Sequence, residues 1–305
     1  MSETRRGIAA SPAMSARTAL AALLGGAVGI AFAPIFVRLS ELGPSATAFW
    51  RLALALPPLW LWANLEGRGT VAPRQPSFVT DYRRLVAAGL FFAADLAVWH
   101  WSIKFTSVAN ATLLANATPI FVTLAAWFWF GQRFTPTFIL GMAAAMAGAA
   151  ILAGASFRLS IHHLLGDALG LLTAVFYAGY ILAVKGLRDD FSAATIMTWS
   201  GVVSALTLLP VTLVSGERLI AFTIRGWAIL VGLALVSHVG GQGLIALALA
   251  HLPAAFSSVG LLLQPAVAAV FAWIILNEPI GPWQALGGVI VLAGIVLARQ
   301  GSRSA

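Results

Sequence analysis

The sequence predicts an all-α membrane protein with ten transmembrane helices, arranged as two inverted five-helix repeats. Three observations lead to this prediction: the composition, the spacing of long apolar segments, and the similarity of the two halves. The 305 residues are 60% hydrophobic and 9% charged, and the mean hydropathy is +0.92. Soluble domains carry roughly 25% charged residues. Most of the outer surface of this chain must therefore face lipid.

Segments of about 20 mainly apolar residues, the length that crosses a bilayer, recur from Arg17 almost to the end of the chain. Charges, prolines and glycines separate them. The first segment ends in Ala-Phe-Ala, like a signal-peptidase site, but its length and its place in the repeat indicate an uncleaved helix. The predicted helices span residues 17–37, 44–64, 84–103, 107–130, 136–154, 165–186, 193–213, 226–250, 253–276 and 282–298.

The distribution of Lys and Arg among the loops predicts the orientation. With the N-terminus inside, the outside loops hold few basic residues, namely Arg38, Lys104, Arg158, Arg218 and Arg225. The inside set is larger: Arg5, Arg6, Arg17, Arg68, Arg74, Arg83, Arg84, Arg133, Lys185, Arg188, Arg299 and Arg303. Because positively charged loops stay in the cytoplasm, we expect a cell inner membrane protein with both termini cytoplasmic. The net charge of +8 belongs to these loops and forms no clustered basic face, so no nucleic-acid partner is expected.

The two halves of the chain are related in sequence. Residues 115–153 align without gaps on residues 261–299. The matched pairs are Pro119 with Pro265, Trp127 with Trp273, Pro136 with Pro282, Gly141 with Gly287 and Gly148 with Gly294. We therefore assign residues 17–154 and 165–299 to two repeats within one transmembrane unit. A repeat with an odd number of spans inserts its second copy upside down, and inverted repeats are typical of alternating-access carriers with a substrate site near the midplane.

Residues 248–297 contain Pro265, the Asn-Glu-Pro sequence at residues 277–279, and the pair Gly287 and Gly294. In these features the segment resembles the EamA domain of the drug/metabolite transporter (DMT) superfamily. The first half shows the same pattern, and its segment "FWRLALA" resembles the second helix of the family with its Arg.

This resemblance covers roughly residues 17–299 and implies ten helices, inverted five-helix repeats and export of small metabolites. One departure is Gln132, which stands where the family usually has Glu. Gln132 is matched with Glu278 in the alignment of the two repeats. The resemblance therefore does not assign this chain a pair of carboxylates at equivalent positions. The many aromatic residues at cavity depth favour the YddG-type branch, which exports aromatic amino acids.

Ionisable residues inside the predicted helices are candidates for a substrate site, because charges at membrane depth are expensive. Arg51 could recognise a substrate carboxylate, or its side chain could snorkel to the interface. Asp95 and Trp99 share a helix face at i, i+4. Asp95 could bind an ammonium group, carry a proton, or hydrogen-bond to a neighbouring helix. His100 and Trp101 follow near the outer end, where Trp is commonly an interfacial residue.

The second half carries a comparable polar stripe. His238 and Gln242 lie at i, i+4 in the eighth helix, and Gln242 aligns within one residue of Asp95. Equivalent helices thus both present polar side chains, as a central cavity requires. Packing alone is the alternative, since Gly240, Gly241 and Gly243 permit close helix approach.

Further polar side chains complete the predicted site. These are Thr112 and Asn116 in the fourth helix, Thr173, Tyr177 and Tyr180 in the sixth, and Ser258 and Gln264 in the ninth. Such groups can also simply bond across helices. Pro119 and Pro265 are predicted kinks or hinges, and Glu278 is predicted to be a cap or a contact between helices.

Aromatic side chains could form a pocket that suits flat apolar groups or an ammonium. The candidates are Trp99, Trp101, Tyr177, Tyr180 and Trp199. Ordinary packing is the alternative, because the chain contains 11 Trp and 18 Phe that lipid-facing helices would use anyway.

No P-loop, GxSxG or HExxH motif and no cysteine is present. The two adjacent histidines, His162 and His163, are too few to predict a metal site. We therefore expect neither an enzyme nor a cofactor. The leading hypothesis is a secondary transporter that exports amino acids, aromatic ones among them, with small-molecule substrate and membrane lipids as partners. The alternatives are export of other metabolites or drugs, and a membrane-embedded enzyme acting on lipid. Proton coupling and oligomeric state are left open.

Overall fold

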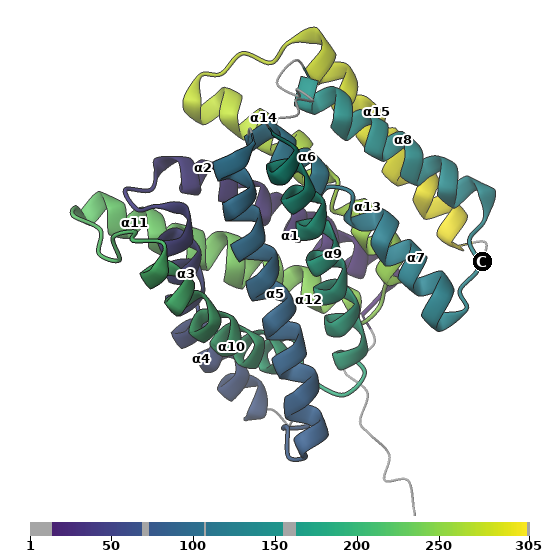
Figure 1. The fold of residues 1–305 in the computed structure, drawn as a ribbon. Coiled ribbons are helices and arrows are strands. Elements are labelled where there is room, and N and C mark those ends of the chain that lie inside the picture. The colour runs from purple at the N-terminus through teal and green to yellow at the C-terminus, as the bar shows by residue number, and fades with distance from the viewer. Residues whose placement is uncertain (1–13, 69–72, 107, 155–162, 304–305) are drawn as a thin grey trace, which may run out of the picture.

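The computed structural model describes residues 14–68, 73–106, 108–154 and 163–303, and every regular element in this part is helical (Figure 1). Nine helical segments there are long and apolar enough to cross a membrane. The predicted second helix, which is broken at residues 54–55, is not one of the nine. The prediction of an all-α membrane protein is confirmed.

The ten predicted helices are all present, although several are interrupted. The first five are α1 (Ala16–Ala31) with α2 (Ala33–Leu39), α3 (Pro44–Ala53) with α4 (Leu56–Gly67), α5 (Val79–Phe105), α6 (Val108–Ala115) with α7 (Thr118–Phe130), and α8 (Pro136–Ala153). The second five are α9 (Leu164–Leu187), α10 (Ala193–Val214), α11 (Ile224–Gly232) with the π-helix η3 (Leu233–Gln242) and α12 (Gly243–Leu249), α13 (Ala254–Gly260) with α14 (Leu263–Leu276), and α15 (Pro282–Arg303).

The start of α5 lies five residues before the predicted start at Arg84. The carboxylate of Asp81 accepts hydrogen bonds from the backbone N–H groups of Ser77 and Phe78, each at 3.2 Å. Arg74 pairs with the same carboxylate at 2.7 Å. A carboxylate that satisfies N–H groups at a helix start stabilises that end, so the helix extends beyond its apolar part.

Proline explains the interruptions of the fourth and ninth helices. A proline has no N–H and its ring clashes with the carbonyl four residues earlier. Pro119 and Pro265 stand just after the breaks at residues 116–117 and 261–262. The Thr118 hydroxyl donates to the freed carbonyl of Ala115 at 2.8 Å. Such a bond keeps a broken helix tolerable inside a membrane.

Helices α8 and α15 hold equivalent places in the two repeats and lie side by side at one edge of the molecule (Figure 1). Gly148 lies against the carbonyl of Gly287, and Gly294 lies against the carbonyl of Gly141. Residue numbers rise along one helix as they fall along the other, so the helices are antiparallel. Equivalent helices that run in opposite directions mean that the repeats are inverted.

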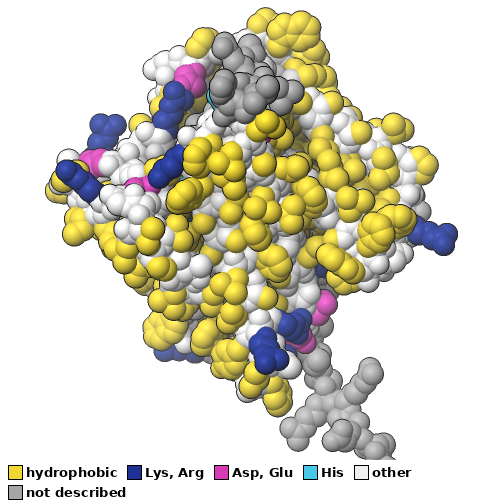
Figure 2. Space-filling model, viewed as in Figure 1, with side chains coloured by type: hydrophobic (Ala, Val, Ile, Leu, Met, Phe, Trp, Pro, Cys, Tyr) yellow, Lys and Arg dark blue, Asp and Glu magenta, His cyan; other side chains and the backbone are white. Residues whose placement is uncertain are grey.

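The loops group on two faces as alternate membrane crossing requires. On one face Arg38 pairs with Glu278 at 2.5 Å, and Lys104 approaches Glu217 at 3.8 Å. On the other face Arg84 pairs with Asp190. Between these ends, hydrophobic side chains cover most of the visible surface, with charges at its margins (Figure 2). The contact predicted for Glu278 is therefore an ion pair with the end of α2.

Two acidic residues hold the loops of the first face together. Glu217 accepts a hydrogen bond from the backbone N–H of Ala46 at 3.0 Å, at the start of α3. Glu41 accepts from the Thr223 hydroxyl and from the N–H groups of Phe222 and Thr223 before α11. These bonds, first the one from the hydroxyl, hold the pKa of the Glu41 carboxyl below its usual range. The loop that contains Glu217 therefore holds the start of α3, and the loop that contains Glu41 holds the start of α11.

The contact between α8 and α15 gives a testable prediction. A Cβ on Gly287 would lie 2.8 Å from the Gly148 carbonyl oxygen and 2.9 Å from the Leu152 nitrogen, whereas one on Gly288 would meet nothing within 4 Å. We expect Gly287→Ala to destabilise the protein by about 1–3 kcal/mol through overpacking. Gly288→Ala, the matched control, should leave the thermal unfolding midpoint in detergent unchanged or higher. Equal midpoints for the two variants would contradict the packing.

Candidate functional site

A cavity of about 220 Å³ lies between the two repeats. Its wall takes residues from both halves of the chain, which is where the sequence placed a site. The predicted site residues found in the wall are Arg51, Asp95, Trp99, His100, Asn116, Pro119, Tyr177, Gln242, Gln264 and Pro265, together with Thr112, Thr173 and Ser258. The sequence therefore located most of the wall, although it could not say which side chains meet.

Arg51 and Asp95 bring opposite charges into the same cavity. Arg51 projects from α3 and Asp95 from α5, two helices that pack together. Asp95 is only 9% exposed, and the Nε of Arg51 is buried without a hydrogen-bond partner. None of the ion pairs among the described residues includes either side chain. Buried charges that form no ion pair within the protein are costly, so both side chains are available to a ligand of opposite charge.

Aromatic side chains form part of the wall beside these charges. Trp99 and Tyr177 line the cavity as predicted, and Phe92 joins them. Tyr180 is 2% exposed and lies behind this layer, stacked on Phe92 with ring centroids 4.6 Å apart. Phe92 carries no polar group, so nothing in the sequence distinguished it from ordinary packing residues.

Two predicted pocket residues lie on the outer surface instead. Trp101 is 40% exposed, and the Lys104 ammonium lies 5.5 Å from the centre of its ring. Residues two apart on a helix point to nearly opposite sides, so Trp101 cannot share the face of Trp99. Trp199 is 38% exposed and packs edge-on against Tyr82. The five-residue aromatic pocket expected from the sequence is thus reduced to two of its members.

The π-helix separates His238 from Gln242. Gln242 lines the cavity and interacts with the hydroxyls of Tyr177 and Tyr180. His238 lies outside the wall, 1% exposed and stacked on Phe92 at 5.5 Å. The expected i, i+4 alignment holds for an α-helix, whereas a π-helix bonds i to i+5 and turns more widely. No pattern in the sequence indicated this local change.

Small apolar residues, which sequence reasoning missed, complete the wall. They lie on the first, second and ninth helices and include Ile30, Ala33, Pro34, Val37, Ala48, Leu262 and Ala268. Such residues occur throughout a membrane chain and carry no chemical signature. In the described part of the chain no three His, Asp or Glu side chains cluster closely enough to hold a metal ion.

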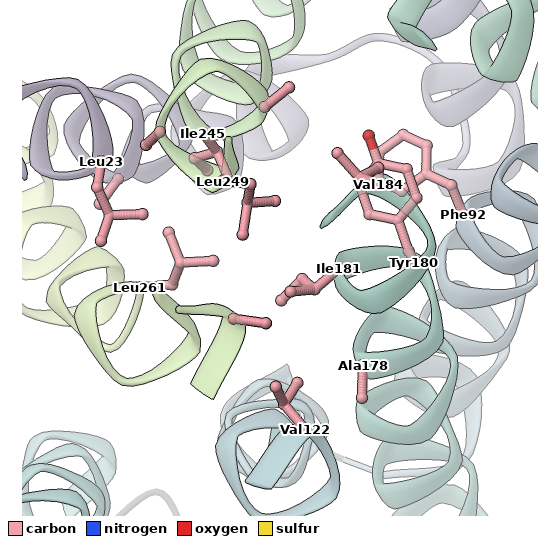
Figure 3. Close-up of a cluster of buried hydrophobic side chains, with 14 of the residues drawn as sticks. Leu23, Phe92, Val122, Ala178, Tyr180, Ile181, Val184, Ile245, Leu249 and Leu261 are labelled. Atoms are coloured by element: carbon pink, nitrogen blue, oxygen red, sulfur yellow. The ribbon is translucent and has the colours of Figure 1, made fainter. Parts of the chain in front are cut away.

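A cluster of buried apolar side chains packs beside the cavity. This cluster, here named the apolar seal, consists of Leu23, Val122, Ile181, Val184, Ile245, Leu249 and Leu261. Figure 3 shows Leu23, Ile181 and Leu261 pointing toward the same central region from three different segments. The seal lies in the half of the bundle nearest the start of α1. Wall residues such as Thr47 and Thr112 belong to the opposite half, which ends at the face of Arg38 and Lys104.

A cavity within a membrane, enclosed by two inverted repeats with broken helices, is the arrangement of secondary transporters. The chain belongs to the EamA-like transporter family, whose model matches residues 17–154 and 164–300. The expected membership of the DMT superfamily is thereby confirmed.

Several known proteins are similar to this chain. A probable terminal-alkyne amino-acid exporter of Streptantibioticus cattleyicolor is 29% identical, and the match covers 88% of each chain. An uncharacterized transporter of Archaeoglobus fulgidus is 26% identical over 86% of this chain and 91% of its own length. The pseudopaline exporter of Pseudomonas aeruginosa is 27% identical over 70% of this chain and 74% of its own. One solved structure, 17% identical, shares the fold with a TM-score of 0.80 over 95% of this chain and 99% of that one.

The apolar seal and the cavity wall predict different reactivities for introduced cysteines. The natural chain has no cysteine, so single substitutions report on their own positions. We expect Ala268→Cys, in the wall, to react with a water-soluble maleimide faster than Val184→Cys, which replaces a seal residue that is 1% exposed. The reaction can be followed by mass spectrometry of the purified protein. Equal rates would contradict the seal.

Proposed function

We propose that this protein is a secondary transporter that exports amino acids across the cell inner membrane by alternating access. The observation that carries the proposal is that Arg51 and Asp95 line one cavity and that neither takes part in the ion pairs of the described residues. An α-amino acid places a carboxylate and an ammonium on the same carbon. A guanidinium matches the geometry of a carboxylate, and an aspartate accepts hydrogen bonds from an ammonium. Substrate binding would thus neutralise both buried charges at once.

The aromatic wall supports the same proposal. Phe92, Trp99 and Tyr177 border the region of the two charges, and aromatic faces attract an ammonium. They also suit flat apolar groups. Aromatic amino acids therefore belong among the proposed substrates, in agreement with the branch that the sequence resembles.

The relatives support export of small molecules. One of them is named as a probable amino-acid exporter, which agrees with the charges of this cavity. Another is named as a pseudopaline exporter, and for that reason export of other metabolites is the second candidate. Transport alone accounts for the cavity, and we propose no catalytic activity.

The apolar seal supports a specific state of the transport cycle. The loops beside the seal hold most Lys and Arg residues, which favours their cytoplasmic location and that of both termini. The structure would then correspond to a state closed toward the cytoplasm. Loading from the cytoplasm requires the seal to part and the opposite half to close. The breaks before Pro119 and Pro265 lie at equivalent places in the two repeats, where each half could bend.

Proteoliposomes that contain the purified protein provide the direct test. Radiolabelled amino acids and a sugar are compared for flux into the lumen, with and without an imposed pH gradient. We expect flux of amino acids and none of the sugar. If no amino acid is transported, the proposal is wrong; transport restricted to other metabolites would favour the second candidate.

The charged pair gives a prediction for variants. Arg51→Gln and Asp95→Asn should each lower amino-acid flux about tenfold or more, because a hydrogen bond to a charged group contributes about 1.5–3 kcal/mol. Arg83→Gln and Asp189→Asn make the same changes at exposed positions and should transport normally. Wild-type flux in both cavity variants, at equal expression, would remove the pair from the site.

A further inference from the structure

Two amide side chains in the cavity wall are not used by the protein itself. The Nε2 of Gln264 is buried and has no hydrogen-bond partner. The side-chain amide of Asn116 takes part in none of the hydrogen bonds formed by the described residues, and both side chains line the cavity. A buried donor left without an acceptor is energetically costly, so such groups are uncommon unless something else binds them.

Two hydroxyl groups close to the amides in the sequence are, by contrast, satisfied within the protein. The Thr118 hydroxyl donates to the carbonyl of Ala115 at 2.8 Å, and the Ser258 hydroxyl donates to that of Ala255 at 2.7 Å. Thr118 is the equivalent of Gln264 in the alignment of the two repeats. The first repeat thus repairs its broken helix at this position, whereas the second presents a free donor to the cavity.

The amides occupy a different wall from the charges. Asn116 lies in the break between α6 and α7, and Gln264 lies in the first turn of α14. Both breaks border the cavity, and α7 packs against α13. Arg51 and Asp95 project instead from α3 and α5. A molecule held by its α-carboxylate and α-ammonium at the charges can therefore extend its side chain toward the amides.

The surroundings of the amides limit the kind of group that fits. The wall there is small and apolar, with Ala31, Ala33, Pro34, Leu262 and Ala268. Arg51 and Asp95 in the wall come from α3 and α5, not from the helices that carry the amides. A charged group of a substrate placed beside the amides would therefore be left unpaired. An amide offers both N–H donors and a carbonyl acceptor. An uncharged polar group is the complement of this wall.

We propose that Asn116 and Gln264 form a subsite for the substrate side chain and that this subsite selects uncharged amino acids with a polar far end, such as a carboxamide or a hydroxyl. The proposal rests on the proposed function, since it takes Arg51 and Asp95 to hold the α-carboxylate and the α-ammonium. A site built to bond a polar group rejects the analogue that lacks it, because its own polar atoms are then left unpaired. Asparagine, glutamine and tyrosine should therefore be preferred to leucine, methionine and phenylalanine, which resemble them in shape.

The test is competition in proteoliposomes. Each of the six amino acids is titrated against a transported labelled amino acid, and the ratio of inhibition constants is measured for each polar and apolar pair. We expect the polar member to bind about tenfold more tightly, which corresponds to about 1.4 kcal/mol. In Gln264→Met and in Asn116→Leu this ratio should fall toward one, with the binding of the apolar member retained or improved.

Asn64→Leu is the matched control, because Asn64 is exposed on α4 and already donates to the carbonyl of Trp60 at 2.8 Å. It should keep the wild-type ratios. Thermal unfolding midpoints distinguish a misfolded variant from one with altered selectivity. A wild-type protein without preference, or ratios unchanged in both cavity variants, would overturn the subsite while leaving amino-acid export intact. Absence of flux for every amino acid would overturn the proposed function and the subsite with it.

Discussion

The satisfaction of backbone hydrogen bonds inside a membrane is the constraint on which this structure depends. In hydrocarbon, each peptide group must be bonded within the protein, so irregular backbone is tolerated only where it is buried in protein or lines a cavity. The breaks at residues 116–117 and 261–262 and the π-helix η3 all adjoin the cavity. The same interruptions that cost helical hydrogen bonds thus create the space for a ligand and turn Asn116 and Gln264 toward it.

Helices α8 and α15, at one edge of the molecule, are uninterrupted and hold the two repeats together. Glycines let α8 and α15 approach until the backbone of one meets that of the other, as at Gly148 and Gly287. Gly148 meets Gly287, and Gly294 meets Gly141. The two contacts are equivalent because α8 and α15 are inverted copies of the same helix. This regular contact leaves the interrupted helices to form the cavity between the repeats.

Sequence reasoning succeeded for the site where chemistry was unusual for a membrane chain. Arg51, Asp95 and Gln242 could be found because charged and amide groups at membrane depth are rare and expensive. It failed where the outcome depended on local helix geometry. Trp101 faces outward because it is two residues from Trp99, and His238 lies behind Phe92 because η3 is wider than an α-helix. Tyr180 belongs to the layer behind the wall.

The sequence by itself determined the fold class, the ten helices, the two related halves and the family, because hydropathy and a repeated pattern of Pro, Trp and Gly are properties of the chain alone. Only the tertiary structure decided which polar residues line the cavity, where the apolar seal packs, and which amides stay unbonded. These properties depend on contacts between segments such as α3 with α5 and α7 with α13. Such contacts join residues far apart in the chain, and no local pattern encodes them.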